Sequence, residues 1–337
     1  MTLENPDKYS IIKKACKTTF QSLKNNPALF VPFLIFAIFE FITLIIIYLA
    51  PRMPLRIIFG PAIRTFWGEQ FLHYPLNFLL LPKLASLSRM FLSVFFSSLL
   101  TGMAVSIVFD LYNKKQVKLK ASFKVALKKY ISLFIVVLIL TATFYFTVKI
   151  ITIGLTRYFI AGHSRLLFLG PGIWIGPILL CLNFILAVLI QSAFIYAIPV
   201  LIIDNEKLIK SIIKSLALFK SLFIPTIILV GLPVLVYIPI IVLKYNTTFL
   251  INRIFPEFIL WVAILGIIVN ALIDLIITTS CTVVYLINKD KGQSPWFLIS
   301  SISAGTVPFS SRGDSPLRLG QGESPVVISK AIRGGQS

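Results

Sequence analysis

The chain has 337 residues, of which 57% are hydrophobic and 13% are charged, and its formal net charge at pH 7 is +20. Its mean hydropathy of +0.92 is higher than a water-soluble surface of this size carries, which excludes an ordinary soluble domain. A charge of +20 in a soluble protein would suggest nucleic acid as the partner. Here the lysines gather in short segments beside apolar runs, so no nucleic-acid partner is expected.

Apolar residues fall into six runs, each long enough to cross a ~30 Å hydrocarbon core as a helix. The predicted crossings are residues 28–50, 88–109, 130–153, 173–199, 221–243 and 257–287. The predicted fold class is therefore all-α, a polytopic membrane helix bundle with six transmembrane helices within residues 1–291. Residues 292–337 are rich in Ser, Gly and Pro and are predicted to be a disordered tail.

Three lysine-rich segments precede the first, third and fifth crossings, and each has an apolar stripe with a period near 3.6 residues. The stripes are Ile12, Cys16, Phe20 and Leu23; Phe123, Ala126, Leu127 and Tyr130; and Leu208, Ile209, Ile212 and Leu216. Basic amphipathic helices of this kind lie in the membrane interface, so membrane lipids with anionic head groups are the expected partners. The predicted lipid contacts are Lys13, Lys14, Lys17, Lys120, Lys124, Lys128, Lys207, Lys210 and Lys214.

The distribution of Lys and Arg predicts the orientation. The three basic segments carry more cations than the intervening loops, which indicates that they lie in the cytoplasm. The protein is therefore expected in the cytoplasmic membrane of a prokaryote, with both termini in the cytoplasm. The longest external loop, 51–87, includes an apolar segment, 73–82, that is too short to cross and is predicted to lie on the membrane surface.

Two short motifs resemble a known family. One is Leu23-Lys-Asn-Asn-Pro27 followed by Pro32, and the other is Ile198-Pro-Val-Leu-Ile-Ile-Asp204-Asn-Glu206 leading to Ser211-Ile-Ile-Lys-Ser215-Leu-Ala-Leu-Phe-Lys220. With the amphipathic N-terminal helix, they resemble a group of prokaryotic six-helix membrane proteins that includes the membrane domain attached to some glycerophosphodiester phosphodiesterases. The resemblance covers about residues 8–290 and implies a six-helix membrane fold. Hydrolysis in that family belongs to a separate soluble barrel, so no catalytic residue carries over.

The sequence offers little material for catalysis. It has two histidines, and neither lies near a Cys or an acid at metal-ligand spacing. The three cysteines, Cys16, Cys181 and Cys281, are not in a motif. Asp204 and Glu206 are predicted to lie in a solvated turn that caps the next helix. We therefore expect a protein that is not an enzyme and has no catalytic residue, metal ion or cofactor.

Polar residues inside the predicted crossings are the remaining candidates for a site. Glu40 lies near the middle of the first crossing and Asp274 near the middle of the sixth, with Asn270 one turn earlier. Asn183 and Gln191 lie in the fourth crossing. A carboxylate in hydrocarbon costs at least ~2.5–3.5 kcal/mol, so each acid must face protein or water. Either these residues form a proton or cation site, or they form interhelical hydrogen bonds of ~0.6 kcal/mol each.

The expected function is a non-enzymatic membrane scaffold or lipid-interacting module. The alternative is a small transporter or channel that uses Glu40 and Asp274. A transporter requires a polar lining that connects the acids to the membrane faces, whereas a scaffold requires isolated polar pairs in a closed bundle.

Overall fold

The computed structural model describes residues 8–162 and 171–292, and every regular element in these ranges is a helix. The first half contains α1 (Lys8–Asn25), η1 (Pro27–Phe30), α2 (Val31–Leu49), α3 (Arg56–Phe66), η2 (Glu69–Leu72), α4 (Asn77–Leu92), the π-helical turn η3 (Ser93–Ser97), α5 (Ser98–Tyr112) and α6 (Leu119–Lys128). The second half contains α7 (Tyr130–Gly162), α8 (Pro171–Phe194), α9 (Ala197–Ile203), α10 (Leu208–Ser221), α11 (Phe223–Leu235), α12 (Ile238–Tyr245), α13 (Thr247–Arg253) and α14 (Phe258–Gly292). The predicted tail beyond Gly292 lies outside the described residues.

Five helical segments are long and apolar enough to cross a membrane. They are Pro27–Leu49, Asn77–Tyr112, Tyr130–Gly154, Leu179–Ile203 and Phe258–Asp290. A sixth crossing is reached if Leu208–Ser221 and Phe223–Leu235, which meet at 95°, are taken as one bent span. The protein is thus an all-α polytopic membrane helix bundle, which confirms the predicted fold class, with five or six crossings in the described part of the chain.

The second crossing begins eleven residues earlier than predicted. Residues 77–87 were expected in the external loop 51–87, but they form the first part of a continuous helix, α4–η3–α5, that ends at Tyr112. The cause is Lys83, Ser86 and Arg89, which lower the local hydropathy although the helix continues through them. Residues 77–82 of the predicted surface segment 73–82 thus belong to this long helix.

The predicted fifth crossing, 221–243, is divided into α11 and α12 by the turn residues Val236 and Tyr237. Proline explains the division, because Pro239 has no N–H to donate to the carbonyl of Leu235. The chain instead makes hydrogen bonds that span three residues, from Val236 N to Pro233 O and from Tyr237 N to Val234 O.

All three predicted amphipathic segments are helices, namely α1, α6 and α10, and each ends just before a long or broken helix. Pairs of small residues four positions apart form their buried faces: Ala15 and Thr19, Ser122 and Ala126, and Ser211 and Ser215. Large apolar side chains of the predicted stripes are instead exposed, with Phe20 67% and Ile209 70% exposed. Other stripe residues pack against the main core, namely Ile12, Cys16, Leu23, Ala126, Leu208 and Ile212. The predicted stripes thus contain part of each packed face, but the fully buried positions of α1 and α10 lie one residue before the stripe, where small side chains allow the helix to lie close against the bundle.

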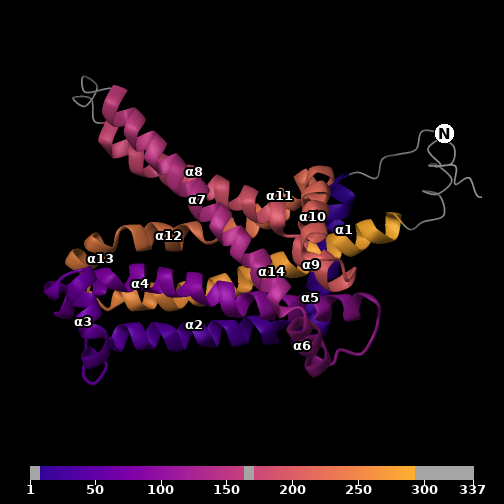
Figure 1. The fold of residues 1–337 in the computed structure, drawn as a ribbon, viewed down its shortest axis with the longest axis horizontal. Helices are drawn as coiled ribbons and strands as arrows, with labels where there is room; N and C mark the ends of the chain where they lie inside the picture. Colours follow the sequence, from indigo (N-terminus) through magenta and orange to yellow (C-terminus); the bar gives the residue numbers. More distant parts are fainter. Residues whose placement is uncertain (1–7, 163–170, 293–337) are drawn as a thin grey trace, which may run out of the picture. The chain divides into compact units, whose positions relative to one another are not determined.

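The main hydrophobic core joins α1, α6, α9 and α11 to α5 and to the second half of α14 (Figure 1). A second core lies at the other end of the bundle, where Leu44 of α2, Phe78 of α4 and Ile259 of α14 pack together. Helices α7 and α8 form a hairpin that diverges from α4 and α12 in Figure 1. In an apolar stretch of 18 residues in α7 only 11% of residues are buried, whereas 56% are buried in the corresponding stretch of α4–α5. The apolar part of α7 therefore contributes few buried side chains to the bundle.

Candidate functional site

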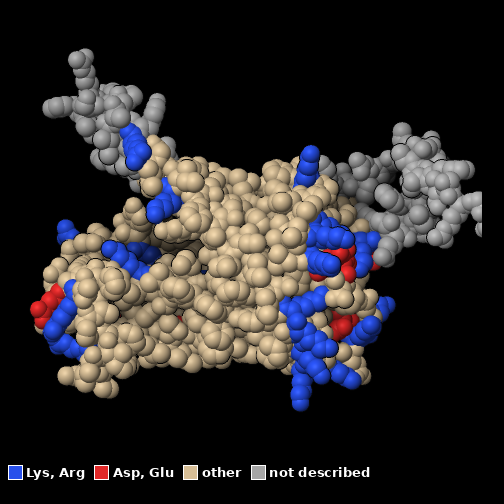
Figure 2. Space-filling view, in the orientation of Figure 1, with Lys and Arg blue, Asp and Glu red and all other residues tan. Residues whose placement is uncertain are grey.

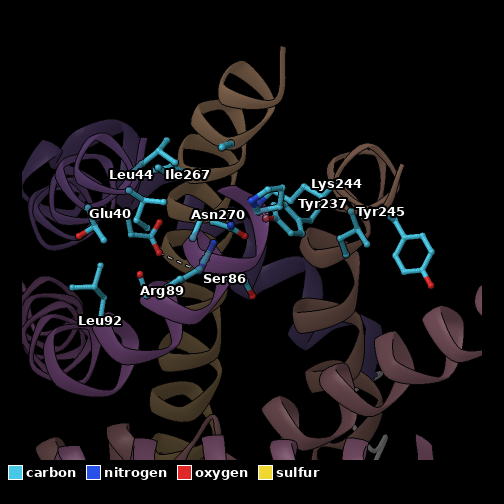
Figure 3. A pocket seen from close by; sticks show the side chains of 17 residues that line it. Glu40, Leu44, Ser86, Arg89, Leu92, Tyr237, Lys244, Tyr245, Ile267 and Asn270 are labelled. Atoms are coloured by element: carbon cyan, nitrogen blue, oxygen red, sulfur yellow. Dashed lines mark hydrogen bonds and ion pairs between the residues drawn. The ribbon is translucent and has the colours of Figure 1, made fainter. Parts of the chain in front are cut away.

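A cavity of about 440 Å³ lies between α2, α4, α12 and α14 (Figure 3). Its walls carry three ionisable side chains, Glu40, Arg89 and Lys244, together with the phenol of Tyr237 and the amide of Asn270. The volume is within the ~300–1,000 Å³ range typical of small-molecule sites. An intramembrane cavity with this lining is the best-developed candidate site in the described part of the chain.

Arg89 of α4 connects the two predicted acids. Its Nε is 3.1 Å from Oε1 of Glu40 on α2, and its Nη2 is 3.6 Å from Oδ2 of Asp274 on α14. The Glu40 side chain is only 5% exposed, whereas Arg89 and Asp274 are 31% and 35% exposed. One guanidinium thus pairs with two carboxylates from different helices, which lowers the cost of keeping them within the span although its single charge offsets only one of the two.

Lys244, near the end of α12, supplies a second cation on the opposite wall. Its Nζ donates a hydrogen bond of 2.9 Å to the hydroxyl of Tyr237 and lies 5.5 Å from the centroid of the same ring. Gly266 of α14 makes room for the pair, because a Cβ at this position would lie 3.1 Å from Lys244 Nζ. Lys244 forms no ion pair with a described carboxylate.

Asn270 lies between the two cations in the view of Figure 3. Asn270 lines the cavity and is 8% exposed, yet its Nδ2 has no hydrogen-bond partner among the described residues. A buried N–H group without an acceptor costs ~1–3 kcal/mol. The amide is therefore a donor that a ligand or water in the cavity would satisfy.

The structure separates the predicted polar residues into two groups. Glu40 and Asp274 both pair with Arg89, and Asn270 lines the same cavity as Glu40 and Arg89. Asn183 and Gln191 lie on α8 and do not line this cavity. The five residues are therefore not one site.

Sequence reasoning missed Arg89 and Lys244. Arg89 was placed at the edge of the second crossing and Lys244 in an external loop, so both were counted only as topology markers. A detectable signal exists for Arg89, since apolar residues dominate both before and after it, in Asn77–Pro82 and Met90–Leu100. A charge between two apolar stretches is typical of a charge inside one long helix.

The nine lysines predicted to contact lipid are all exposed. Figure 2 shows Lys and Arg gathered at the end of the bundle where α1, α6 and α10 lie in Figure 1. Exposed large apolar side chains on the same helices, including Phe20, Phe123 and Ile213, accompany these charges. Such a surface combines the two properties that a helix in the membrane interface needs.

Asp204 has a structural role that the sequence prediction missed. Instead of lying in a solvated turn, its carboxylate is 10% exposed and accepts hydrogen bonds from Tyr285 Oη at 2.6 Å, from Lys289 Nζ at 2.8 Å and from Lys214 Nζ. Burial opposes its ionisation, but these three hydrogen bonds outweigh burial and hold the pKa of Asp204 below its ordinary value. Asp204 therefore connects the α9–α10 turn to the end of α14.

No family model, no curated protein and no solved structure matches this chain. The site is therefore interpreted from its own geometry.

Proposed function

We propose that this protein is a small membrane transporter whose substrate site is the cavity around Glu40, Arg89 and Lys244. The observation that carries the proposal is the cavity itself, because ionisable groups from three helices reach a space large enough for a small molecule. A scaffold requires isolated polar pairs in a closed bundle, and this lining differs from that arrangement.

Energetics support a functional reason for these charges. Replacing a buried ion pair by apolar residues of similar volume is often neutral or stabilising, so stability alone does not favour Glu40 and Arg89 inside a bundle. Ionisable residues within membrane spans are costly and are typical of ion and substrate pathways.

The broken helix beside the cavity also supports transport. Tyr237 lies in the break between α11 and α12 and contacts the cavity lysine. Transporters commonly place their sites at discontinuous helices. The cavity uses the second half of α2 and the first half of α14, whereas the main core uses Phe33 of α2 and Ile273–Ile287 of α14. Separation of the helices in the main core would therefore expose the cavity to the side of the membrane at which that core lies.

The proposed location is the cytoplasmic membrane, with both termini in the cytoplasm and α1, α6 and α10 against anionic lipid head groups. The exposed lysines of these helices support this orientation. A scaffold or lipid-interacting role without transport is the second candidate, and the same basic surface favours it.

Cysteine accessibility tests transport without knowledge of the substrate. In a variant without Cys16, Cys181 and Cys281, a cysteine replaces Ser88, which lines the cavity. A membrane-impermeant methanethiosulfonate is then applied separately to right-side-out cells and to inverted vesicles. We expect Ser88→Cys to react from both sides, because a transport cycle exposes the site alternately. Ser192→Cys, at a fully buried position on α8, should not react.

Each other outcome contradicts the transport proposal. Reaction from one side only would indicate a binding site without transport, and reaction from neither side would indicate a closed scaffold. Two further cysteines report orientation in the same preparations. Gln70→Cys should react in intact cells and Lys118→Cys in inverted vesicles, since both positions are exposed outside the apolar spans.

A further inference from the structure

We infer that the ligand of this cavity is an amphipathic anion, a carboxylate or phosphate monoester on a single apolar chain, with its head group at Lys244 and Asn270. This inference names the substrate class of the proposed transporter and rests on that proposal.

The direct contacts of the two cations indicate the sign of the ligand. Arg89 lies within ion-pair distance of both Glu40 and Asp274. Lys244 interacts with Glu40 only at longer range, and its direct contacts among the described residues are a phenol and its ring. An anion beside Lys244 supplies the charge-assisted hydrogen bond that no described carboxylate makes with this ammonium group.

Asn270 provides the second, independent observation. Its Nδ2 donor is buried and without a described acceptor, and it lines the same cavity as Lys244. Carboxylate and phosphate oxygens accept hydrogen bonds from amide donors and from ammonium groups alike. A single anionic group thus satisfies both side chains.

The remaining walls indicate the other end of the ligand. Leu44 and Ile47 of α2, Leu92 of α4, and Ile241 of α12 face the same space. These apolar side chains offer no hydrogen bond to a polar ligand, whereas an alkyl chain gains free energy from burial against them. A fully polar anion such as inorganic phosphate would fit the head-group end alone.

Photolabelling tests the inference directly. The protein is reconstituted in phosphatidylcholine nanodiscs, which have no net charge, and labelled with a diazirine-bearing palmitic acid. We expect cross-links in the wall segments 82–92 and 263–270. Laurate and dodecyl phosphate should compete with the label, and the stronger competitor identifies a carboxylate or a phosphate ligand. Dodecyltrimethylammonium, a cation with the same chain, should not compete.

A matched pair of lysine variants tests the head-group contact. Lys244→Gln should weaken labelling of these segments about tenfold, the effect of losing ~1.4 kcal/mol of charge-assisted contact, and Lys244→Arg should restore part of it. Lys149→Gln is the control. Lys149 also lies over a tyrosine ring, 5.7 Å from the centroid of Tyr145, but it lines a groove between α4 and α7 that shares with the cavity only Pro82 and Ser86.

Equal competition by the cation, or unchanged labelling in a folded Lys244→Gln variant, would overturn the inference. If a Lys244 variant does not fold, the competition pattern in the wild-type protein still tests whether the ligand is an anion. Failure of the transport proposal gives a different result from failure of this inference. In that case Ser88→Cys would react from one side of the membrane or from neither, while anion-specific labelling would persist.

Discussion

Substitution of Asp204 by Ala should destabilise the fold more than any other single change in the α9–α10 turn. The side chain connects this turn to Tyr285 and Lys289 of α14 and to Lys214 of α10. Alanine removes all three connections and leaves the Tyr285 hydroxyl, on a residue 3% exposed, without its acceptor.

The magnitude follows from the exposure of each partner. The bond from buried Tyr285 to a carboxylate is of the kind worth ~1.5–3 kcal/mol. The Lys214 and Lys289 side chains are 44% and 32% exposed, so solvent screens both pairs and each contributes ~0.2–1 kcal/mol. The expected loss in Asp204→Ala is therefore about 2–5 kcal/mol.

Thermal unfolding in detergent measures this loss, with an expected fall of the apparent Tm by roughly 5 °C or more. Asp204→Asn should lose less, because an amide oxygen still accepts from Tyr285. Glu206→Ala is the control, since Glu206 forms no hydrogen bond or ion pair with a described residue, and its effect should stay within about 0.5 kcal/mol. Equal melting of the Asp204→Ala and Glu206→Ala proteins would refute the reasoning.

The pH dependence has a defined sign. Because the pKa of Asp204 is lowered in the folded protein, its charge stabilises the fold fully above the unfolded-state value of ~3.9. The advantage of the wild type over Asp204→Asn should therefore be constant from pH 7 to about pH 5 and disappear below about pH 4, as the pH falls through the lower folded-state pKa. An advantage that disappears near neutral pH would contradict the lowered pKa.

Two further predictions concern packing in the main core, and both are measured by thermal unfolding. Gly102→Ala should lower the free energy of unfolding by ~1–3 kcal/mol, because the new Cβ would lie 2.7 Å from Cδ1 of buried Leu133. Gly154→Ala is the control, since its Cβ would have no neighbouring atom within 4 Å, and it should lower the free energy of unfolding by less than ~1 kcal/mol. The Thr226 hydroxyl donates to Leu222 O, so Tyr196 must donate to Thr226. Thr226→Val should therefore cost ~1–3 kcal/mol by leaving the buried phenol without an acceptor, and Tyr196→Phe only ~0.5–1.5 kcal/mol; the reverse order would refute this assignment.

The length of the apolar runs predicted the helical crossings, because this length depends on the hydropathy of every residue in the run and not on a single position. The spans Pro27–Leu49 and Phe258–Asp290 correspond closely to the predicted 28–50 and 257–287. The basic segments were also recognised as helices, since their period near 3.6 is a local property. Which residues of α1 are fully buried was not recognised, because Ala15 and Thr19 are less apolar than the exposed Phe20. Close approach of helices selects small side chains, and hydropathy does not measure size.

Asp204 shows a different limit of sequence reasoning. Two acids in a short polar turn predict a helix cap, and this prediction uses only neighbouring residues. The observed partners Tyr285 and Lys289 are 81 and 85 positions away along the chain. A single sequence contains no signal for such a pairing, so the carboxylate that connects two parts of the bundle looked like an ordinary turn residue.

The candidate site was not recognised in the sequence because two of its residues, Ser86 and Arg89, are polar. Lys83, Ser86 and Arg89 interrupt the apolar run of the second crossing, so its predicted start moved to residue 88 and the interruption was assigned to a loop. Arg89 then counted as evidence for orientation when it is the partner of Glu40 and Asp274. Hydropathy treats a charge as the end of a span, whereas a cavity needs charges within the span. Hence the polar groups of an intramembrane site shorten the crossings that hydropathy predicts. Lys244, one residue beyond the predicted fifth crossing, was likewise counted with a loop, although it lies in α12 and lines the cavity.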